Sequence, residues 1–575
     1  MKRIPEPGRA CVLLVTGGLL FSMSACSGSG PGTPSLLGGY PIAPDVQTTI
    51  QRTVVPGSIR PDVPKVLPFE VARYAANGYG TWTYGPGVAS VKRLDLMPTN
   101  YQGARPANAA SLLGFATMSD IHVTDEETPA QAIAMGFRGG TSSGYSAVMP
   151  YTTQVLDAAV QTINALGKKQ QIDFVMSLGD AIDDDQLNEL RWYIDTLDGR
   201  IVSPDSGVKD DPIAGPLNDY QDSFTAAGLD PTIPWYQTLG NHDHFWMGTL
   251  PVDAYLRQAY VGDTILNMGN PFTDPLAGNS RGMYMGAIDG TTPDATIIGA
   301  GLVSASTDAP KILAADPDRR PVSIVEWMHE YFTTSSTPVG HGFTQANLDS
   351  GSADYSFVPR SDVPIKMIVL DDTQPGTCNG VSGCGHSYLD RAGYDWLVSQ
   401  LDAGQAAGQL MIISMHEPIG VDVGDPYLGW SPTSAVTESA LTAKLHTYPN
   451  LLALVAGHRH GNTITAFASP DPARPELGFW QIETSSLRDF PQQFRTFQVM
   501  RNSDGTVSIL TTDVDPAVAA GSPAALSRTY AVATQELFKN PVVALPAGAV
   551  NAELVKQLSP EMQAKLQDPG IVIGR

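Results

Sequence analysis

Six short apolar runs, each ending abruptly in polar residues, recur along the middle of the chain. They cover residues 112–122, 171–180, 233–243, 365–373, 409–418 and 450–462. Two of them follow segments whose apolar residues recur at helical spacing, 151–170 and 389–405. Strands that alternate with helices predict an α/β fold with a substantial buried sheet. Ligands of such folds bind beyond the carboxyl ends of the strands, so the polar residues there are the first candidates for a site.

After residue 462 the pattern becomes extended and alternating. The segments 478–486, 494–502 and 506–514 carry this alternation, and the turn sequence NSDG joins the last two. This pattern predicts an antiparallel meander or an edge hairpin.

The remaining segments lack such clear periodicity. We expect residues 27–110, rich in Pro and Gly, to form a tether and an irregular N-terminal extension. The main domain is expected at 111–515, with a long Gly-rich insertion at about 245–360 that lies at one rim of the site. Residues 516–575 are predicted to form an Ala-rich helical tail.

The first 26 residues carry the pattern of an export signal. Basic residues precede an apolar stretch, CVLLVTGGLLF, that is too short to span a bilayer. The following SMSAC resembles a bacterial lipoprotein signal, in which Cys26 is lipidated and becomes the new N-terminus. The alternative is an ordinary secretory signal that is cleaved nearby. Both alternatives export the chain, so we expect it in the periplasm or at the cell surface. The favoured lipoprotein signal would also anchor it by lipid to a bacterial membrane.

The net charge and the cysteines indicate which binding partners and which cross-links to expect. The chain of 575 residues has a formal net charge of −23, which disfavours nucleic-acid binding through a basic patch. Cys378 and Cys384, in CNGVSGC, are predicted to close a small disulfide loop in an oxidising compartment. A metal site is the alternative for these cysteines, but no second cysteine pair accompanies them. The sequence does not indicate the oligomeric state.

The residues at the strand ends are those that bind divalent transition metals. They are Asp120, His122, Asp180, Asn241, His242, Asp243, His416, His458 and His460. Imidazole nitrogens suit zinc, iron and manganese, and carboxylate or amide oxygens complete such sites. A Gly before each of Asp180, Asn241 and His458 permits tight turns and close backbone approach.

The ordered set D-x-H, G-D, G-N-H-D, H and G-H-x-H resembles the calcineurin-like metallophosphoesterase superfamily, in particular its large, insertion-bearing bacterial exported branch. The resemblance implies a four-layer α/β/β/α sandwich with two transition-metal ions (Mn, Fe or Zn). One metal ion would be held by Asp120, His122, Asp180 and His460. The other would be held by Asp180, Asn241, His416 and His458, so that Asp180 bridges the two.

The resemblance also implies a reaction. A metal-bridging hydroxide would hydrolyse a small phosphomonoester or phosphodiester, with His242 stabilising charge or protonating the leaving oxygen and Asp243 orienting the imidazole of His242. Two alternatives remain at this point: hydrolysis of a nucleotide pyrophosphate at the same site, or a non-catalytic metal-binding surface lipoprotein. A pure binding protein would not need His242.

Some positions depart from the family pattern or carry no implied role. Purple acid phosphatases have a tyrosine three residues after the bridging Asp, where this chain has Asp183, so an iron–tyrosinate centre is not expected. The run Asp183 to Asp185 is predicted to be an acidic helix start, with support of the metal ligands as the less favoured alternative. We expect Arg459 to point away from the site and Arg488 to reach it from a loop, and we assign no role to His244.

Overall fold

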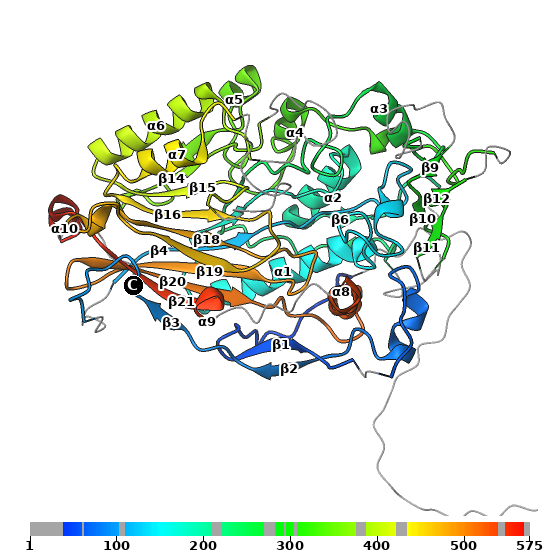
Figure 1. Ribbon diagram of the computed structural model, residues 1–575, viewed down its shortest axis with the longest axis horizontal. Helices are drawn as coiled ribbons and strands as arrows, with labels where there is room; N and C mark the ends of the chain where they lie inside the picture. Colours follow the sequence, from blue (N-terminus) through cyan, green and yellow to red (C-terminus); the bar gives the residue numbers. More distant parts are fainter. Residues whose placement is uncertain are drawn as a thin grey trace, which may run out of the picture. The chain divides into compact units, whose positions relative to one another are not determined.

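Two mixed β-sheets form the centre of the protein in the computed structural model (Figure 1). The structure describes residues 38–59, 62–102, 110–208, 220–269, 282–292, 295–303, 308–374, 387–420, 434–538 and 547–567. The predicted export signal, Cys26 and the pair Cys378 and Cys384 lie outside the described residues.

The first sheet has seven strands and contains three of the six predicted apolar runs. In spatial order its strands are β3 (Val91–Arg93), β21 (Asn551–Gln557), β20 (Thr506–Val514), β19 (Phe494–Arg501), β4 (Ala110–Met118), β5 (Phe174–Ser177) and β8 (Trp235–Gln237). Strands β4, β5 and β8 are parallel, so their carboxyl ends lie at one edge of the sheet.

The second sheet has six strands and contains the other three runs. Its strands in spatial order are β13 (Tyr355–Phe357), β14 (Ile365–Val369), β15 (Leu410–Ser414), β16 (Leu451–Ala456), β18 (Phe479–Glu483) and β17 (Thr463–Phe467). The four inner strands are parallel and the two edge strands antiparallel. The inner parallel strands are buried on both faces, which explains their nearly continuous apolar sequences.

Alternate residues of β14 show how the layers are stacked. Met367 packs into the core cluster that also contains Phe115 of the other sheet, whereas Ile368 packs into a second cluster with Leu397 of helix α6 (Arg391–Ala406). Helix α7 (Glu438–Leu445) contributes to this second cluster.

The seven-stranded sheet is covered by helices as well. Leu156 and other residues of α1 (Thr152–Gly167) pack into the core cluster with β4 and β5, and α1 contacts α2 (Leu187–Asp198) and α8 (Pro523–Phe538). The order helix, sheet, sheet, helix confirms the predicted four-layer sandwich (Figure 1).

The remaining described segments form short elements outside the two main sheets. They are β1 (Arg52–Pro56), β2 (Trp82–Pro86), β6 (Ile201–Val202), β7 (Phe224–Thr225), α3 (Ala254–Val261), β9 (Met283–Tyr284), β10 (Ala287–Asp289), β11 (Thr296–Ile298), β12 (Gly301–Leu302), α4 (Ile324–Glu330), α5 (Gln345–Ser350), α9 (Ala547–Val550) and α10 (Pro560–Leu566). Among the described residues, no helix is both long enough and apolar enough to cross a bilayer.

The C-terminal tail is not helical throughout, which corrects the prediction. Its segment β21 pairs antiparallel with β20, and β3 of the N-terminal extension pairs in parallel with β21. Strand β20 otherwise presents unpaired backbone groups on that side, and β21 satisfies them. The short alternation of NAELVKQ, with Ala552 and Leu554 buried, suits this position.

The predicted meander is also only partly correct. Strands β19 and β20 form the expected antiparallel hairpin. Strand β18, however, joins the other sheet in parallel with β16. All of its residues are buried, as expected for an inner strand with both faces covered.

Candidate metal centre

The ends of five strands from both sheets bring all seven predicted metal ligands together. Asp120 and His122 follow β4, and Asp180 follows β5. The other four come from the ends of the remaining strands: Asn241 after β8, His416 after β15, and His458 and His460 after β16. Their donor atoms form two groups.

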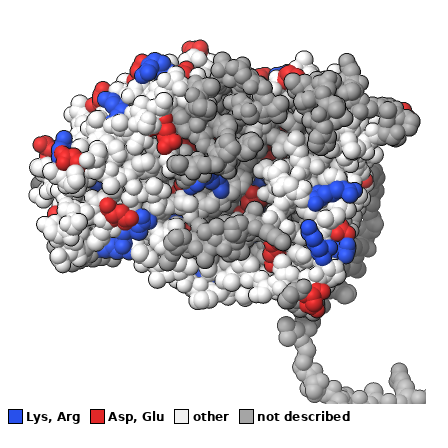
Figure 2. All heavy atoms as spheres, in the orientation of Figure 1, with Lys and Arg blue, Asp and Glu red and all other residues white. Residues whose placement is uncertain are grey.

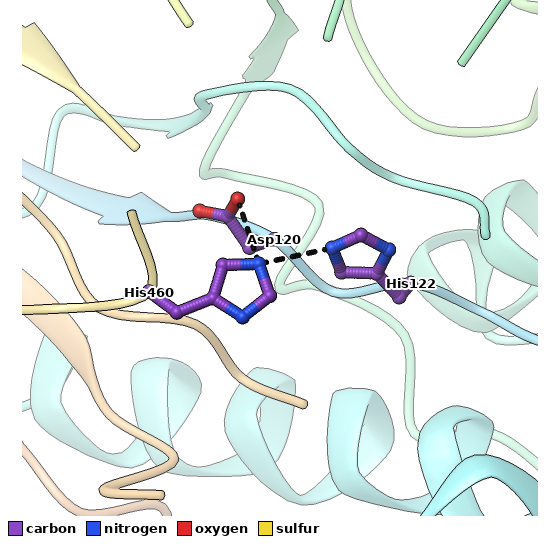
Figure 3. Close-up of side chains that lie close together, drawn as sticks. All are labelled: Asp120, His122 and His460. Atoms are coloured by element: carbon purple, nitrogen blue, oxygen red, sulfur yellow. Dashed lines mark hydrogen bonds and ion pairs between the residues drawn. The ribbon is translucent and has the colours of Figure 1, made fainter. Parts of the chain in front are cut away.

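The first group meets at one nitrogen of His460, which Asp120 and His122 both approach (Figure 3). Its Nε2 lies 3.3 Å from Asp120 Oδ1 and 3.2 Å from His122 Nε2. Asp180 Oδ2 lies 3.6 Å from His122 Nε2 on the other side. Four side chains thus present two nitrogen and two oxygen donors to one small volume.

The second group shares Asp180 with the first. Asp180 Oδ2 lies 3.2 Å from His416 Nε2, which lies 2.9 Å from Asn241 Oδ1. Asn241 Oδ1 lies 3.2 Å from His458 Nδ1. The same carboxylate oxygen of Asp180 therefore faces donors of both groups, as a bridging ligand would.

Hydrogen bonds on the outer side hold three of the four imidazoles with one nitrogen pointing inward. His416 Nδ1 donates to the carbonyl of Leu178 at 2.8 Å, so in the neutral form of the ring Nε2 carries the lone pair. His122 Nδ1 lies 3.0 Å from Asp183 Oδ1, and His460 Nδ1 lies 2.7 Å from Asp489 Oδ2. Metal-binding histidines are oriented in this way. Inward lone pairs beside carboxylates fit two transition-metal ions, although which residues ligate them stays a prediction.

The backbone at these positions adopts an unusual conformation. Five of the seven residues have a φ in the left-handed region: Asp120 (50°), His122 (48°), Asp180 (51°), His458 (70°) and His460 (54°). Residues other than glycine rarely adopt this backbone conformation, and backbone strain of this kind concentrates at functional sites. Gly179, at φ 99°, permits the close approach of two loops, because a Cβ there would lie 2.8 Å from Gly240 Cα.

The electrostatics of the site depend on its burial. Burial raises the pKa of Asp180, but the neighbouring His416 and His242 outweigh this effect and hold the pKa of Asp180 well below its usual range. Burial lowers the pKa of His242 to about 4. For His242, the loss of solvation on burial outweighs the stabilisation of its charged form by nearby carboxylates.

His242 lies beside the first group, with its ring edge-on to that of His122 at 4.5 Å between centroids. Its Nδ1 donates to the carbonyl of Asp183 at 2.6 Å. The side chain of Asp183 accepts from His122 and from Arg488 Nη1 at 3.1 Å. Helix α2 begins only at Leu187, so the favoured interpretation of Asp183 as part of a helix start is wrong.

Asp243 does not orient His242, which corrects the second catalytic assignment. Its carboxylate accepts four backbone N–H groups: Gly240 (2.8 Å), Asp180 (3.1 Å), Ala181 (2.9 Å) and Ile182 (3.3 Å). These bonds hold the loops that carry Asp180 and Asn241 together. The imidazole of His242 is instead oriented by the carbonyl of Asp183.

The other candidates are placed as follows. Arg488 reaches the site through Asp183, and Arg459 turns away from it to pair with Glu483, as expected. His244 Nε2 lies 3.0 Å from Thr373 Oγ1, which itself donates to a carboxylate, so this nitrogen carries the proton. Asp489 and the carbonyl of Leu178 were missed, because no sequence motif marks them.

Comparisons with known proteins add the following. No family model matches the chain, and no curated protein matches it. Among solved structures it is similar to a dimetal phosphatase from Danio rerio, with 11% identity and a TM-score of 0.34 over 71% of this chain and 100% of that one. It is also similar to a purple acid phosphatase from yellow lupin (Lupinus luteus) seeds, with 10% identity and a TM-score of 0.29 over 76% of this chain and 55% of that one. Such values carry no conclusion about the reaction, which rests on the side chains themselves.

Proposed function

We propose that the chain is a dinuclear metal-dependent phosphoesterase that hydrolyses a small phosphomonoester or phosphodiester. The observation that carries this proposal is the pair of donor groups that meet at a single oxygen, Oδ2 of Asp180. Two cations about 3.5–4 Å apart would acidify a water molecule and balance the charge of the phosphoryl oxygens. The seven ligands would be those that the sequence predicted.

The residues around the ligands would complete the chemistry. The bond from His242 Nδ1 to the carbonyl of Asp183 fixes one proton on that nitrogen, so the second proton of the charged imidazolium form would sit on Nε2 and would pass from there to the leaving oxygen. Asp243 would act indirectly, by holding the loop of Asp180 in its left-handed conformation. These roles assign proton transfer to His242 alone.

The setting of the reaction is part of the proposal and rests on the N-terminal sequence. Export to the periplasm or the cell surface, with a lipid on Cys26 that contacts the membrane, is supported by the basic, apolar and small-residue segments of 1–26. Basic side chains on the face shown in Figure 2 lie scattered among acidic ones. This distribution suits a small phosphate ester better than a nucleic acid as substrate.

The test is hydrolysis of mono- and bis-(p-nitrophenyl) phosphate by residues 27–575, metal-free and loaded with Mn²⁺, Zn²⁺ or Fe²⁺. The variant is His242→Asn, whose amide nitrogen can still donate to the carbonyl of Asp183. We expect turnover only with metal, and a loss of about 10²–10⁴-fold in kcat in the variant while two metals stay bound. Failure of the wild-type protein to bind two metals would refute the proposal.

A further inference from the structure

One of the four imidazoles, that of His458, lacks the outer hydrogen bond that orients the other three. Its Nδ1 faces Asn241 in the second donor group. Its Nε2 is buried and makes no hydrogen bond among the described residues. The nearest acidic oxygen is Oε2 of Glu417, at 3.9 Å, which is too long for a hydrogen bond.

Glu417 is itself in an unfavourable position. It is 1% exposed, and neither of its carboxylate oxygens makes a well-formed hydrogen bond within the described part of the chain, where the backbone N–H of Ser387 is a nearby donor. A buried carboxylate without a partner destabilises the fold, so this side chain is not explained by stability.

The relative position of His458 and Glu417 suggests that each supplies the hydrogen-bond partner that the other lacks. Nδ1 of His458 points to the second donor group and Nε2 points to Glu417. A cation on Nδ1 withdraws charge from the ring and makes the N–H at Nε2 a stronger donor. The same cation offsets the negative charge of a carboxylate behind the ring.

We propose that Glu417 is the positioning residue of His458, and that it accepts the N–H of Nε2 when a cation occupies the second donor group. The proposal rests on the two-cation part of the proposed function and names a residue that no motif indicated. It places a carbonyl or carboxylate behind each of the four imidazoles: Leu178 for His416, Asp183 for His122, Asp489 for His460 and Glu417 for His458.

The test uses the full mature chain, residues 27–575, and the variant Glu417→Gln, which keeps the shape but removes the charge. The matched control is Asp157→Asn, an equally buried carboxylate on α1 that accepts the backbone N–H of Ala227 and lies outside the site. Two quantities are measured on metal-free protein: the affinity of each step of a calorimetric titration with Zn²⁺, and the melting temperature.

We expect Glu417→Gln to weaken one of the two Zn²⁺ steps by about 10–100-fold and to leave the other unchanged. We also expect its metal-free melting temperature to equal or exceed that of the wild type, because the amide keeps the shape of a side chain whose oxygens accept no well-formed hydrogen bond within the described residues, so no bond is lost. A merely structural role would lower that temperature and weaken both steps alike. The control should leave both steps unchanged.

The outcomes separate this proposal from the proposed function. Two Zn²⁺ steps that are both unaffected by Glu417→Gln would overturn the role of Glu417 and leave the phosphoesterase proposal standing. Selective weakening of one step in a protein that hydrolyses no phosphate ester would support Glu417 and count against the phosphoesterase. A wild-type protein that binds fewer than two Zn²⁺ ions would overturn both.

Discussion

The carboxylate of Asp243 offers the sharpest test of how the site is held together. Each of its oxygens accepts two backbone N–H groups: Oδ2 those of Gly240 and Asp180, and Oδ1 those of Ala181 and Ile182. In Asp243→Asn one oxygen is replaced by an NH2 group, which cannot accept. Two buried N–H groups then lose their acceptor, at about 1–3 kcal/mol each, so we expect a loss of about 2–6 kcal/mol in the free energy of unfolding.

The measurement is urea unfolding of the metal-free protein, compared with Asp157→Asn. The control carboxylate accepts one backbone N–H, from Ala227, and one side-chain N–H, from Gln161, so its amide can keep the backbone bond and loses only the bond from Gln161. We expect the control to lose about 0.5–1.5 kcal/mol. An Asp243→Asn protein that is as stable as the control but inactive would refute the reasoning, because Asp243 would then act on His242.

Two further predictions concern His242 and a buried lysine. In Gly248→Ala, at φ 63°, the new Cβ would overlap both Asn241 Nδ2 and His242 Cδ2, so both side chains must shift. We expect kcat to fall at least about tenfold while the free energy of unfolding falls by about 1–2 kcal/mol, and unchanged kinetics would contradict this placement of the two side chains. Burial lowers the pKa of Lys556, which donates to the carbonyls of Glu476 and Gly478, to about 7. Between about pH 7 and pH 10 the unfolded chain therefore binds a proton that the folded chain does not. In urea unfolding, the free energy of unfolding of the wild type relative to Lys556→Met should rise with pH by up to about 1.4 kcal/mol per pH unit. A difference that is independent of pH would exclude the lowered pKa.

Local sequence predicted much of this site, because each motif directly follows an apolar run. Once Asp180 and His416 are placed after parallel strands of the two sheets, the stacking of the sheets brings the two side chains together at the carboxyl ends of these strands. The backbone N–H groups that Asp243 accepts were not predictable in this way, because the direction of a backbone N–H depends on the φ and ψ angles of the loop that carries it. For the same reason the carbonyl of Leu178, which leaves no mark in the sequence, was missed.

Pairing between distant segments was the other limit. Strand β21 lies next to β20 and β3, and the latter is more than 400 residues away in the sequence. A seven-residue alternation next to helical segments does not specify such a partner. Asp489 and Glu417 were overlooked because a carboxylate behind an imidazole is selected by distance in the folded chain and not by spacing along it.

The residues of the site with a φ in the left-handed region place the stability of the fold in opposition to its hydrolytic activity. Five non-glycine residues hold a conformation that disfavours each of them by about 1–2 kcal/mol. Glycine would relieve this strain at every one of the five positions and would remove a predicted ligand each time. Selection for thermal resistance alone should therefore enrich glycine most readily at position 458, where the side chain has no outer hydrogen bond to lose, and should yield more stable proteins with an impaired centre. A library screened first for stability and then for hydrolysis would show the two properties moving in opposite directions there.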